Sequence, residues 1–456
     1  MTNQIRAQES DSDLANPLYS SPPKQKAAND TETLSGPTRV GVVGLGYVGL
    51  PLALAMHQAG YEVIGIDVDE RTIGQLTDGR TTISDVSDEN VSMAVEEGIT
   101  FTTDYSALET VDGVSICVPT PLRKTDTPDL SFVVNAAERL APVIPDGCTI
   151  ILESTVYPGA TQEIIGDILT SNGMAIGDDI YLAFSPERID PGNAEFGPTD
   201  IPKVVGGVTD ACGDRATALY ERVFDEVVRV DSATEAELVK LLENTFRAVN
   251  IGLINELAQV AHELDVNIWN AIDAAATKPF GFMPFYPGPG LGGHCIPIDP
   301  FYLSWKAKEQ GIDTRFIDLA DTVNREMPTH VVQRIVEQLN KRGIALSNAT
   351  VLLLGVAYKR DVSDTRESPA IDIIDQLEDW DATVTYHDPH VPELTVLGET
   401  HESTALTTEN LADADCVLLV TDHSRFDIRE IIDNAQLVFD TRNATSQYER
   451  DNVVRL

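Results

Sequence analysis

Basic residues are scarce in this sequence, with 32 Lys and Arg against 73 Asp and Glu and a formal net charge of −41. Because a nucleic-acid-binding face must neutralise phosphates, this charge argues against nucleic acid as a partner. A compact fold with such a charge repels itself at low ionic strength, but at molar salt the Debye length is about 3 Å and the repulsion is screened. The sequence therefore predicts a protein from the cytosol of a halophile, with an ordinary acidic protein as the alternative.

Cysteine is also rare, and no two cysteines form a CxxC pair. The five cysteines are Cys117, Cys148, Cys212, Cys295 and Cys416. An odd number without paired spacing argues against a disulfide framework or a zinc site, so no metal is predicted. Long hydrophobic runs are missing too, since the run at Val351–Val356 is far shorter than the ~20 residues that span a bilayer. With no basic-then-apolar signal at the N-terminus, we expect a cytoplasmic protein without membrane contact.

The length and composition predict a folded protein of several domains. The chain has 456 residues, of which 42% are apolar and 23% charged. This is enough material for roughly two to four domain cores. Residues 1–37 are polar, contain proline and lack periodicity, so we expect a disordered leader there and assign it no function.

The sequence pattern changes at Thr38, where the segment TRVGVVGLGYVGLPLALAMHQAGYEVIGIDVDE begins. An apolar strand, a glycine turn, an apolar helix and a second strand follow one another there, which predicts a βαβ unit. Further strand-like runs, separated by segments of helical length, lie at 113–118, 149–152, 180–184 and 204–205. This alternation predicts a parallel, doubly wound α/β domain over residues 38–231.

From Ser232 the period of the pattern becomes that of a helix. Ser232 and Glu235 have capping-box spacing, and apolar residues recur every three or four positions as far as Leu264. A helix of ~30 residues is about 45 Å long, more than one small domain needs. We therefore expect a central helical domain over residues 232–330 whose long helix joins two domains and offers a face for dimerisation.

Strand-like runs return in the last part of the chain. They lie at 350–354, 383–387, 416–419 and 437–440, with helices between them. They predict a second, smaller domain over residues 331–456. The expected fold is thus α/β, with two Rossmann-like, doubly wound domains joined by a long central helix.

Gly44, Gly46 and Gly49 form a GxGxxG turn between the first strand and the first helix. In such a turn the first glycine permits the tight bend, the second lets backbone approach a pyrophosphate, and the third lets the helix pack closely. Asp67 ends the next strand, where a carboxylate accepts hydrogen bonds from a ribose diol and repels a 2′-phosphate, which favours NAD over NADP. A tight turn of this kind without a cofactor is the alternative.

Cys295 lies in the glycine-rich segment GLGGHCIPIDP at residues 290–300. So many glycines indicate that backbone approaches a ligand closely or makes unusual turns. With Asp299 shortly after it, Cys295 is a candidate nucleophile with an acid–base partner. The alternative is a small buried side chain. His294 is adjacent, but neighbouring side chains often diverge, and we interpret it as structural.

Polar residues form a stripe beside the apolar one on the long helix. Glu237, Lys240, Asn244 and Arg247 recur there at helical spacing. They form a solvated face or, if Lys240 and Asn244 point into a cleft, a site that stabilises an anion or oxyanion.

A second group of charged residues follows a strand in the loop 355–369. It contains Lys359, Arg360 and Arg366, which stand out in so acidic a chain. Such cations suit a diphosphate or carboxylate. A charged surface loop is the alternative.

With these residues the chain resembles the UDP-glucose/GDP-mannose dehydrogenase family of nucleotide-sugar 6-dehydrogenases. The resemblance covers about residues 39–443. Its further signatures are Val118-Pro119-Thr120-Pro121, Glu153-Ser154-Thr155-Val156, Ser185-Pro186-Glu187-Arg188 and Ala236–Asn244. The family implies NAD as cofactor and a UDP-sugar as substrate, and the face of the long helix predicts a homodimer or higher homo-oligomer. It also implies four-electron oxidation of the sugar C6 alcohol to a carboxylate by two NAD⁺ in succession.

The resemblance implies a role for each matching residue. Cys295 would add to the aldehyde as a thiohemiacetal, whose oxidation gives a thioester that water hydrolyses. Lys240, Asn244 and Asp299 would support proton transfer and stabilise the oxyanion. Thr155 would position the attacking water, and Glu187 would bind substrate or assist hydrolysis.

Three sets of site residues follow. The expected catalytic residues are Cys295, Lys240, Asn244, Asp299, Thr155 and Glu187. The expected NAD-binding residues are Gly44, Gly46, Tyr47, Val48, Gly49, Asp67, Thr120, Thr155 and Arg366. The expected substrate-binding residues are Glu187, Arg188, Lys240, Asn244, Arg247, Gly292 and Lys359.

Two positions depart from the pattern of many UDP-glucose dehydrogenases. Pro191 stands where they carry a second glutamate, and Ile298 where they carry a lysine before the aspartate matched by Asp299. Both resemble the branch that acts on UDP-N-acetylated hexosamines, so we expect UDP-N-acetylglucosamine or UDP-N-acetylmannosamine, with UDP-glucose as runner-up. Rival classes are a two-electron hydroxyacid-type dehydrogenase and a non-catalytic NAD-binding regulator. The two-electron dehydrogenase would form one NADH per sugar and the regulator none, whereas the four-electron oxidation forms two.

Overall fold

The structure is a computed structural model, and it describes residues 38–83, 86–123, 127–188, 199–293 and 296–456. The leader expected at residues 1–37 lies outside the described residues. So do His294 and Cys295, and with them Pro191.

The first sheet has eight strands in the described part of the chain, in the order β3-β2-β1-β4-β5-β6-β7-β8. Their bounds are β1 Arg39–Val43, β2 Glu62–Ile66, β3 Thr100–Thr102, β4 Gly113–Ile116, β5 Thr149–Leu152, β6 Tyr181–Phe184, β7 Lys203–Gly207 and β8 Val227–Val230. Every expected strand of this domain is present. The short strands β3 and β8 were not expected, because neither forms an apolar run.

The strands of this sheet run parallel except for one antiparallel pair, β6 with β7. Helices cover both faces: α1 Gly49–Gln58, α2 Glu70–Thr77, α3 Asp88–Glu97, α4 Ser131–Leu140, α5 Asp167–Ser171 and α6 Asp210–Tyr220, with short turns of helix at Tyr105–Leu108 and Thr161–Gly166. Successive strand residues serve opposite faces, so Ile150 and Leu152 join one core and Ile151 the other. This burial on both faces explains why the strands read as continuous apolar runs.

The central part of the chain is helical. Its helices are α7 Ala233–Glu263, α8 Ile268–Ala276, α9 Asp299–Glu309 and α10 Arg315–Lys341. The side chain of Ser232 caps α7 by accepting from the backbone N–H of Glu235 at 3.1 Å, as expected. The Glu235 carboxylate reaches back to the N–H of Asp231 at 2.9 Å rather than to that of Ser232. At 1.5 Å per residue, the 31 residues of α7 span about 46 Å, so this helix is long enough to underlie both sheets.

The second sheet is wholly parallel in the described residues, in the order β10-β9-β13-β14-β15. Its strands are β9 Thr350–Leu354, β10 Thr383–His387, β13 Cys416–Leu419, β14 Val438–Asp440 and β15 Val453–Arg455, and the hairpin of β11 Glu393–Val396 and β12 Glu399–Glu402 lies beside it. The helices are α11 Pro369–Asp379, α12 Thr408–Asp413 and α13 Ile428–Asn434, with a short turn of helix at Leu346–Asn348. The predicted α/β fold with two doubly wound sheets is confirmed.

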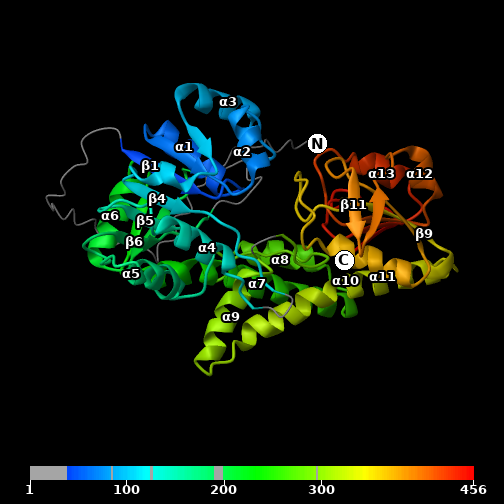
Figure 1. Cartoon of the computed structure of the whole chain (residues 1–456). Coiled ribbons are helices and arrows are strands. Elements are labelled where there is room, and N and C mark those ends of the chain that lie inside the picture. The colour runs from blue at the N-terminus through cyan, green and yellow to red at the C-terminus, as the bar shows by residue number, and fades with distance from the viewer. Residues whose placement is uncertain (1–37, 84–85, 124–126, 189–198, 294–295) are drawn as a thin grey trace, which may run out of the picture.

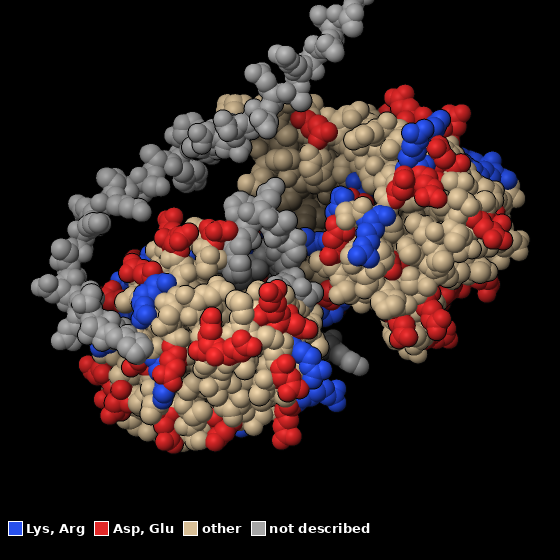
Figure 2. All heavy atoms as spheres, turned by 90° about the horizontal axis from the view of Figure 1, so that it is seen from above, with Lys and Arg blue, Asp and Glu red and all other residues tan. Residues whose placement is uncertain are grey.

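The two sheet domains lie at opposite sides of the molecule, and α7 and α10 pack together between and below them (Figure 1). Seen from above, the surface is hollowed between the two domains (Figure 2). Lys and Arg side chains gather beside this hollow, whereas Asp and Glu dominate the outer faces. In the described residues we find no helix with the length and apolar content needed to cross a membrane.

Candidate active site

In the glycine turn between β1 and α1, two glycines are required by packing within the protein and one is not. A Cβ on Gly44 would lie 2.5 Å from the carbonyl oxygen of Cys117, and one on Gly49 would lie 1.8 Å from that of Gly44. The fold itself therefore excludes side chains at these two positions. A Cβ on Gly46 would meet nothing within 4 Å. Protein packing does not explain Gly46, whereas the approach of a pyrophosphate does.

Asp67 follows β2 and faces this turn. Its carboxylate accepts from the N–H of Leu45 at 2.9 Å and from that of Asp69 at 3.0 Å. Asp67 and Gly46 also line a cavity of about 120 Å³ together with Thr72 and Arg80. Arg80 is paired with Asp78 at 2.8 Å. The cavity, the glycine turn and the Asp67 carboxylate together fit the adenosine and pyrophosphate of NAD.

Tyr47 and Arg366 connect the two sheet domains at this turn. Tyr47 is exposed on the first domain, and the guanidinium of Arg366, from the loop after β9, lies 5.4 Å from its ring centre. Asp364 accepts from Arg366 and holds the guanidinium in place. The structure thus brings Arg366 to the expected NAD site, which the sequence separation alone does not show.

The polar stripe of α7 is buried where it was expected to be functional. Glu237 is wholly buried and Lys240 and Asn244 are 8% exposed, so a solvated face is wrong for these three residues. Arg247, one turn further on, is exposed. The helix thus changes from a buried polar site to solvent within a single turn.

Lys240 and Asn244 meet groups from two other segments. The amide of Asn244 donates to the Asp299 carboxylate at 2.5 Å, and the ammonium of Lys240 donates to the backbone carbonyl of Glu187 at 2.5 Å. Asp299 is the first residue of α9 and is buried. Burial raises the pKa of Asp299 to about 6, although Lys240 and Asn244 favour the charged form. A carboxyl group that titrates near neutrality beside an ammonium is suited to proton transfer.

The glycine-rich segment that contains Cys295 is described up to Gly293 and again from Ile296. A Cβ on Gly292 would lie 2.8 Å from the Cβ of Tyr358, and the N–H of Gly293 donates to the carbonyl of Arg366 at 3.0 Å. These glycines allow the segment to pack against the loop of the second domain. Cys295 itself lies outside the described residues.

Comparison with known protein families gives a match along nearly the whole described chain. Three consecutive models of the UDP-glucose/GDP-mannose dehydrogenase family match it: the NAD binding domain at residues 38–224, the central domain at 234–326 and the UDP binding domain at 352–447. The chain belongs to this family. It is an NAD-dependent UDP-sugar 6-dehydrogenase, an oxidoreductase.

Several members of the family resemble this chain over most of their length. A UDP-N-acetyl-D-mannosamine dehydrogenase of Methanococcus aeolicus is 36% identical over 89% of this chain and 91% of its own. A UDP-N-acetyl-D-glucosamine 6-dehydrogenase of Pseudomonas aeruginosa is 35% identical over 85% of this chain and 91% of its own. The solved structure of a UDP-D-ManNAc dehydrogenase from Pyrococcus horikoshii has a TM-score of 0.82 and 33% identity, and it covers 89% of this chain and 96% of that one.

The remaining expected site residues of this dehydrogenase have different surroundings. Thr155 lies half-buried after β5, and Thr120 is buried, its carbonyl accepting from Tyr302 at 2.7 Å. Arg188 donates to Glu243 of α7 at 2.6 Å and to the carbonyl of Pro202 at 2.7 Å. Its guanidinium therefore braces the segment that carries Glu187 against the central helix.

In the loop 355–369 the cations differ in environment. Lys359 is half-buried, whereas Arg360 is exposed and paired with Asp422 at 3.1 Å. Arg360 therefore fits the alternative of a charged surface loop, and Lys359 remains the candidate for substrate binding.

The sequence analysis missed Lys203, and it did not assign partners to Glu237. Lys203 on β7 donates to the Glu153 carboxylate at 2.6 Å and lies 3.5 Å from that of Glu187, and Tyr220 also donates to Glu153. Glu237 accepts from the N–H of Gly159 and from both the N–H and the hydroxyl of Thr161. A basic residue opening a buried strand in a chain with so few lysines is the signal that could have indicated Lys203.

Proposed function

We propose that this dehydrogenase oxidises the C6 alcohol of a UDP-N-acetylhexosamine to the uronic acid, using two molecules of NAD⁺ per sugar. The observation that carries the proposal is the buried contact of Asn244 and Asp299 beside Lys240, because it sets an amide, a carboxyl group and an ammonium at one point. Charge that develops on an oxygen in a dry site is stabilised far more strongly there than in water.

The names of similar proteins and one residue support the choice of substrate. Relatives at 36% and 35% identity are named for UDP-N-acetyl-D-mannosamine and UDP-N-acetyl-D-glucosamine. Ile298 supports the same branch, since UDP-glucose enzymes commonly carry lysine there. UDP-glucose is the second candidate, because a UDP-glucose dehydrogenase from Pyrobaculum islandicum has a TM-score of 0.80 at 25% identity.

The proposed chemistry divides the oxidation into steps that the residues can support. A base removes the C6 hydroxyl proton while C6 loses a hydride, which gives the aldehyde. The Cys295 thiol adds to that aldehyde, forming a carbon–sulfur bond and a thiohemiacetal. Loss of a second hydride and a proton gives a thioester, which water cleaves to the carboxylate and the free thiol.

The polar residues have separate roles in stabilising charge and in transferring protons. Lys240 and Asn244 stabilise the oxygen at C6 as negative charge builds on it. Asp299, with its pKa of about 6, exchanges the protons of the attacking water and leaving thiol near neutral pH. Thr155 positions that water, and Glu187 binds the sugar or assists hydrolysis.

The cofactor and substrate are held by the two sheet domains. When bound, NAD⁺ would supply the acceptor for the hydride from C6. The turn of Gly44 to Gly49 holds its pyrophosphate, and Asp67 holds the adenosine ribose. Lys359 and Arg366 lie on one loop of the UDP-binding domain, where Lys359 contacts the substrate and Arg366 reaches the cofactor. Because NAD and UDP-sugars are cytoplasmic metabolites, we place the enzyme in the cytoplasm.

We also propose a homodimer formed by an exposed apolar stripe on α7. The stripe is more than 40% exposed at every position and consists of Leu238, Leu242, Phe246, Leu253, Leu257 and Val260. Six such side chains on one helix suit burial against a second copy of the chain. Leu253→Asp should give a monomer in light scattering after gel filtration. Leu397→Asp, at an exposed leucine of the β11–β12 hairpin, is the control and should leave the dimer intact; a monomeric wild type would contradict the proposal.

The decisive experiment counts NADH per sugar at high KCl. Limiting UDP-N-acetylmannosamine, UDP-N-acetylglucosamine, UDP-glucose and GDP-mannose are supplied in parallel. We expect two NADH per N-acetylated sugar. One NADH per sugar would indicate a two-electron dehydrogenase. Two NADH with UDP-glucose alone would overturn the proposed substrate but keep the mechanism. Cys295→Ser should bind NAD and form no acid; near-normal acid formation by this variant would exclude the thioester.

A further inference from the structure

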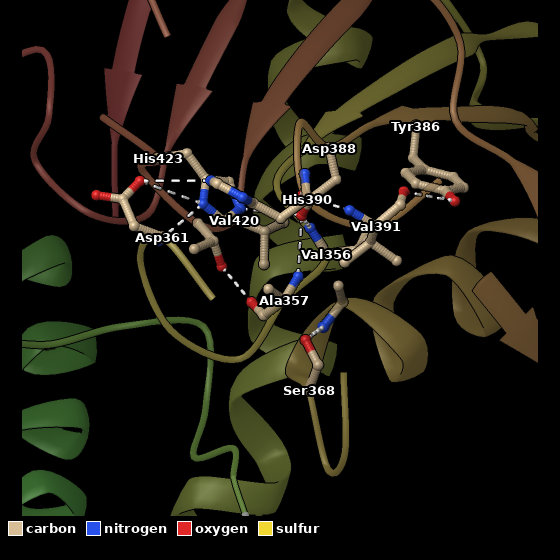
Figure 3. Close-up of polar contacts among 12 residues, drawn as sticks. Val356, Ala357, Asp361, Ser368, Tyr386, Asp388, His390, Val391, Val420 and His423 are labelled. Carbon is tan, nitrogen blue, oxygen red and sulfur yellow. Dashed lines mark hydrogen bonds and ion pairs between the residues drawn. The ribbon is translucent and has the colours of Figure 1, made fainter. Parts of the chain in front are cut away.

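Three loops of the UDP-binding domain meet at the carboxyl edge of the second sheet. Asp361 lies in the loop after β9, His390 in the loop after β10, and His423 in the loop after β13 (Figure 3). These three residues, here the Asp-His-His cluster, have no part in the proposed reaction. Their strands are neighbours in the sheet, so the fold gathers residues that are far apart in the sequence.

The ligand-type atoms of the cluster lie close to one another. Asp361 Oδ1 is 3.7 Å from His390 Nε2 and 3.8 Å from His423 Nδ1, and all three atoms lie within 4.8 Å of each other. Metal–nitrogen and metal–oxygen bonds of about 2.0–2.2 Å place tetrahedral ligand atoms ~3.3–3.6 Å apart. The three atoms are therefore close to coordination distance. Binding also requires the donors that now occupy two of them to move: the N–H of Asp361 at His423 Nδ1, and the N–H and hydroxyl of Ser424 at Asp361 Oδ1.

His390 has an imidazole nitrogen whose hydrogen-bonding capacity is not used. Its Nε2 is buried and makes no hydrogen bond within the described residues, although it faces Asp361 (Figure 3). A buried polar nitrogen without a partner costs free energy, so native structures seldom leave one. A ligand bound between His390 and Asp361 would satisfy it.

His423 is held in the tautomer that a metal ligand at Nδ1 needs. Its side chain is fully buried, and its Nε2 lies 2.9 Å from Asp388 Oδ2. Its Nδ1 accepts from the backbone N–H of Asp361 at 3.0 Å, which requires the proton to be on Nε2. A carboxylate on the far nitrogen of a ligating histidine is the usual support of such a site. Asp388 is fixed in turn by the N–H groups of Val356 and His390.

We propose that Asp361, His390 and His423 bind one divalent transition-metal ion of the Zn²⁺ type, with Asp388 as the supporting carboxylate. Two imidazoles and one carboxylate suit Zn²⁺, Co²⁺ or Ni²⁺ rather than Mg²⁺ or Ca²⁺, which prefer oxygen ligands. The Asp361 side chain is 40% exposed and gives the ion a route from solvent. Binding exchanges the hydrogen bonds at His423 Nδ1 and at Asp361 Oδ1, which now accepts from Ser424, for bonds to the metal.

Such an ion would tie together three loops beside the substrate site. The loop of Asp361 also carries Lys359 and Arg366, and His423 follows Asp422, the partner of Arg360. The ion would hold this loop without taking part in hydride transfer. Its role is thus structural, and its binding can be measured without any assay of activity.

The test is titration of the full chain, stripped with EDTA and free of any affinity tag, with Zn²⁺ by calorimetry and with Co²⁺ by visible absorption. We expect one ion per chain, a rise in melting temperature with Zn²⁺, and d–d bands with Co²⁺. His390→Ala and Asp361→Asn should each weaken binding at least about 10-fold, and Asp388→Asn should weaken it about 10- to 100-fold. Asp361→Asn keeps the size of the side chain and checks against simple misfolding.

His401→Ala is the matched control, because its Nε2 is also buried without a hydrogen-bond partner in the same domain but lies outside the cluster. It should bind the ion like the wild type. Equal affinity in the wild type, His390→Ala and Asp361→Asn would overturn the proposal, as would a wild type that binds neither ion at 100 µM, roughly the weakest affinity a built site should have. Thiolate charge-transfer absorption with Co²⁺ would place the ion on a cysteine instead and would equally overturn it.

Discussion

Lys240, Asn244 and Asp299 are taken out of water by the packing of α7 against α9 and the segment of Glu187. An ionisable group in such a place keeps its charge only through its partners. Burial raises the pKa of Asp299 to about 6, so the carboxyl group gains its negative charge within the pH range of an assay. Its chemistry is therefore set by its surroundings rather than by its residue type.

The first prediction concerns pH. Since the raised pKa leaves Asp299 neutral below about pH 6 and ionised above it, kcat/KM should be high above about pH 6 and fall as the pH drops through that value. Asp299→Asn should remove this acid limb and lower kcat about 10²- to 10⁴-fold. A pH series of initial rates measures both. Asp313→Asn, at an exposed position after α9, should keep the wild-type profile, and an acid limb that persists in Asp299→Asn would assign it to another group.

The glycine turn gives a prediction that separates folding from NAD binding. A methyl group at Gly46 meets nothing in the protein, so Gly46→Ala should melt like the wild type. It should nevertheless raise the Kd for NAD at least about 10-fold, because the methyl group lies where the pyrophosphate approaches. Gly49→Ala places the methyl group 1.8 Å from the carbonyl of Gly44 and should lower the melting temperature. Thermal melts and NAD titrations distinguish the two variants, and a Gly46→Ala enzyme with unchanged NAD affinity would contradict this interpretation of the turn.

At the scale of elements, α7 connects the parts of the site. Glu237 accepts three hydrogen bonds from Gly159 and Thr161, in the segment that follows Thr155. Lys240 and Asn244 follow about one and two turns later on the same helix. The helix thereby fixes the expected water-positioning residue relative to the expected oxyanion-stabilising ones.

This coupling can be tested at Glu237. Glu237→Gln keeps the shape but replaces one acceptor oxygen with an NH₂ group, which leaves a buried donor unsatisfied and should cost about 1–3 kcal/mol of unfolding free energy. We expect kcat to fall more than NAD affinity, because the segment after β5 loosens. Urea melts and steady-state kinetics give the two numbers. Asp313→Asn, at the exposed position after α9, is the control; a Glu237→Gln variant as stable as this control would show that the three hydrogen bonds contribute little.

The pairing of β6 with β7 shows that strands can be recognised from the sequence while their relative direction in the sheet cannot. The apolar runs of both strands were recognised from the sequence. Their antiparallel pairing was not, because direction depends on how the intervening segment returns, and the pattern within each strand is the same either way.

At the scale of the whole molecule, charge is the dominant feature. The net charge is −41, and in the view of Figure 2 Asp and Glu side chains are spread over the outer surface while basic side chains gather beside the hollow between the domains. Exposed ion pairs contribute little to stability, so salt removes little by screening them. Added salt should therefore stabilise the fold, because it screens the repulsion of the net charge more than it weakens the ion pairs.

We accordingly expect the melting temperature to rise steadily between about 0.1 M and 3 M KCl, where the Debye length falls from about 10 Å to below 3 Å. Calorimetric or fluorescence melts in KCl measure it, with sucrose as a control for general stabilisation by excluded solutes. The same curve in NaCl would support screening as the cause. Melting that does not depend on salt would indicate an ordinary acidic protein.

The sequence by itself determined the order of elements, the two doubly wound domains, the long helix and the glycine turn after the first strand. These features depend on patterns within a few tens of residues: the period of apolar residues, a capping serine at Ser232, and glycines at fixed offsets. These features are local: the residues that produce each of them are near one another in the sequence, so the sequence alone shows them.

Only the tertiary structure decided what the polar residues face. Periodicity put Lys240 and Asn244 on a polar stripe, but whether that stripe met water or Asp299 depended on α9, which packs against it. In the same way Arg188 is occupied by Glu243, Arg366 reaches Tyr47 across the domains, and Asp361 meets two histidines. These contacts join residues far apart in the chain, and a local pattern contains no information on which distant surface will cover it.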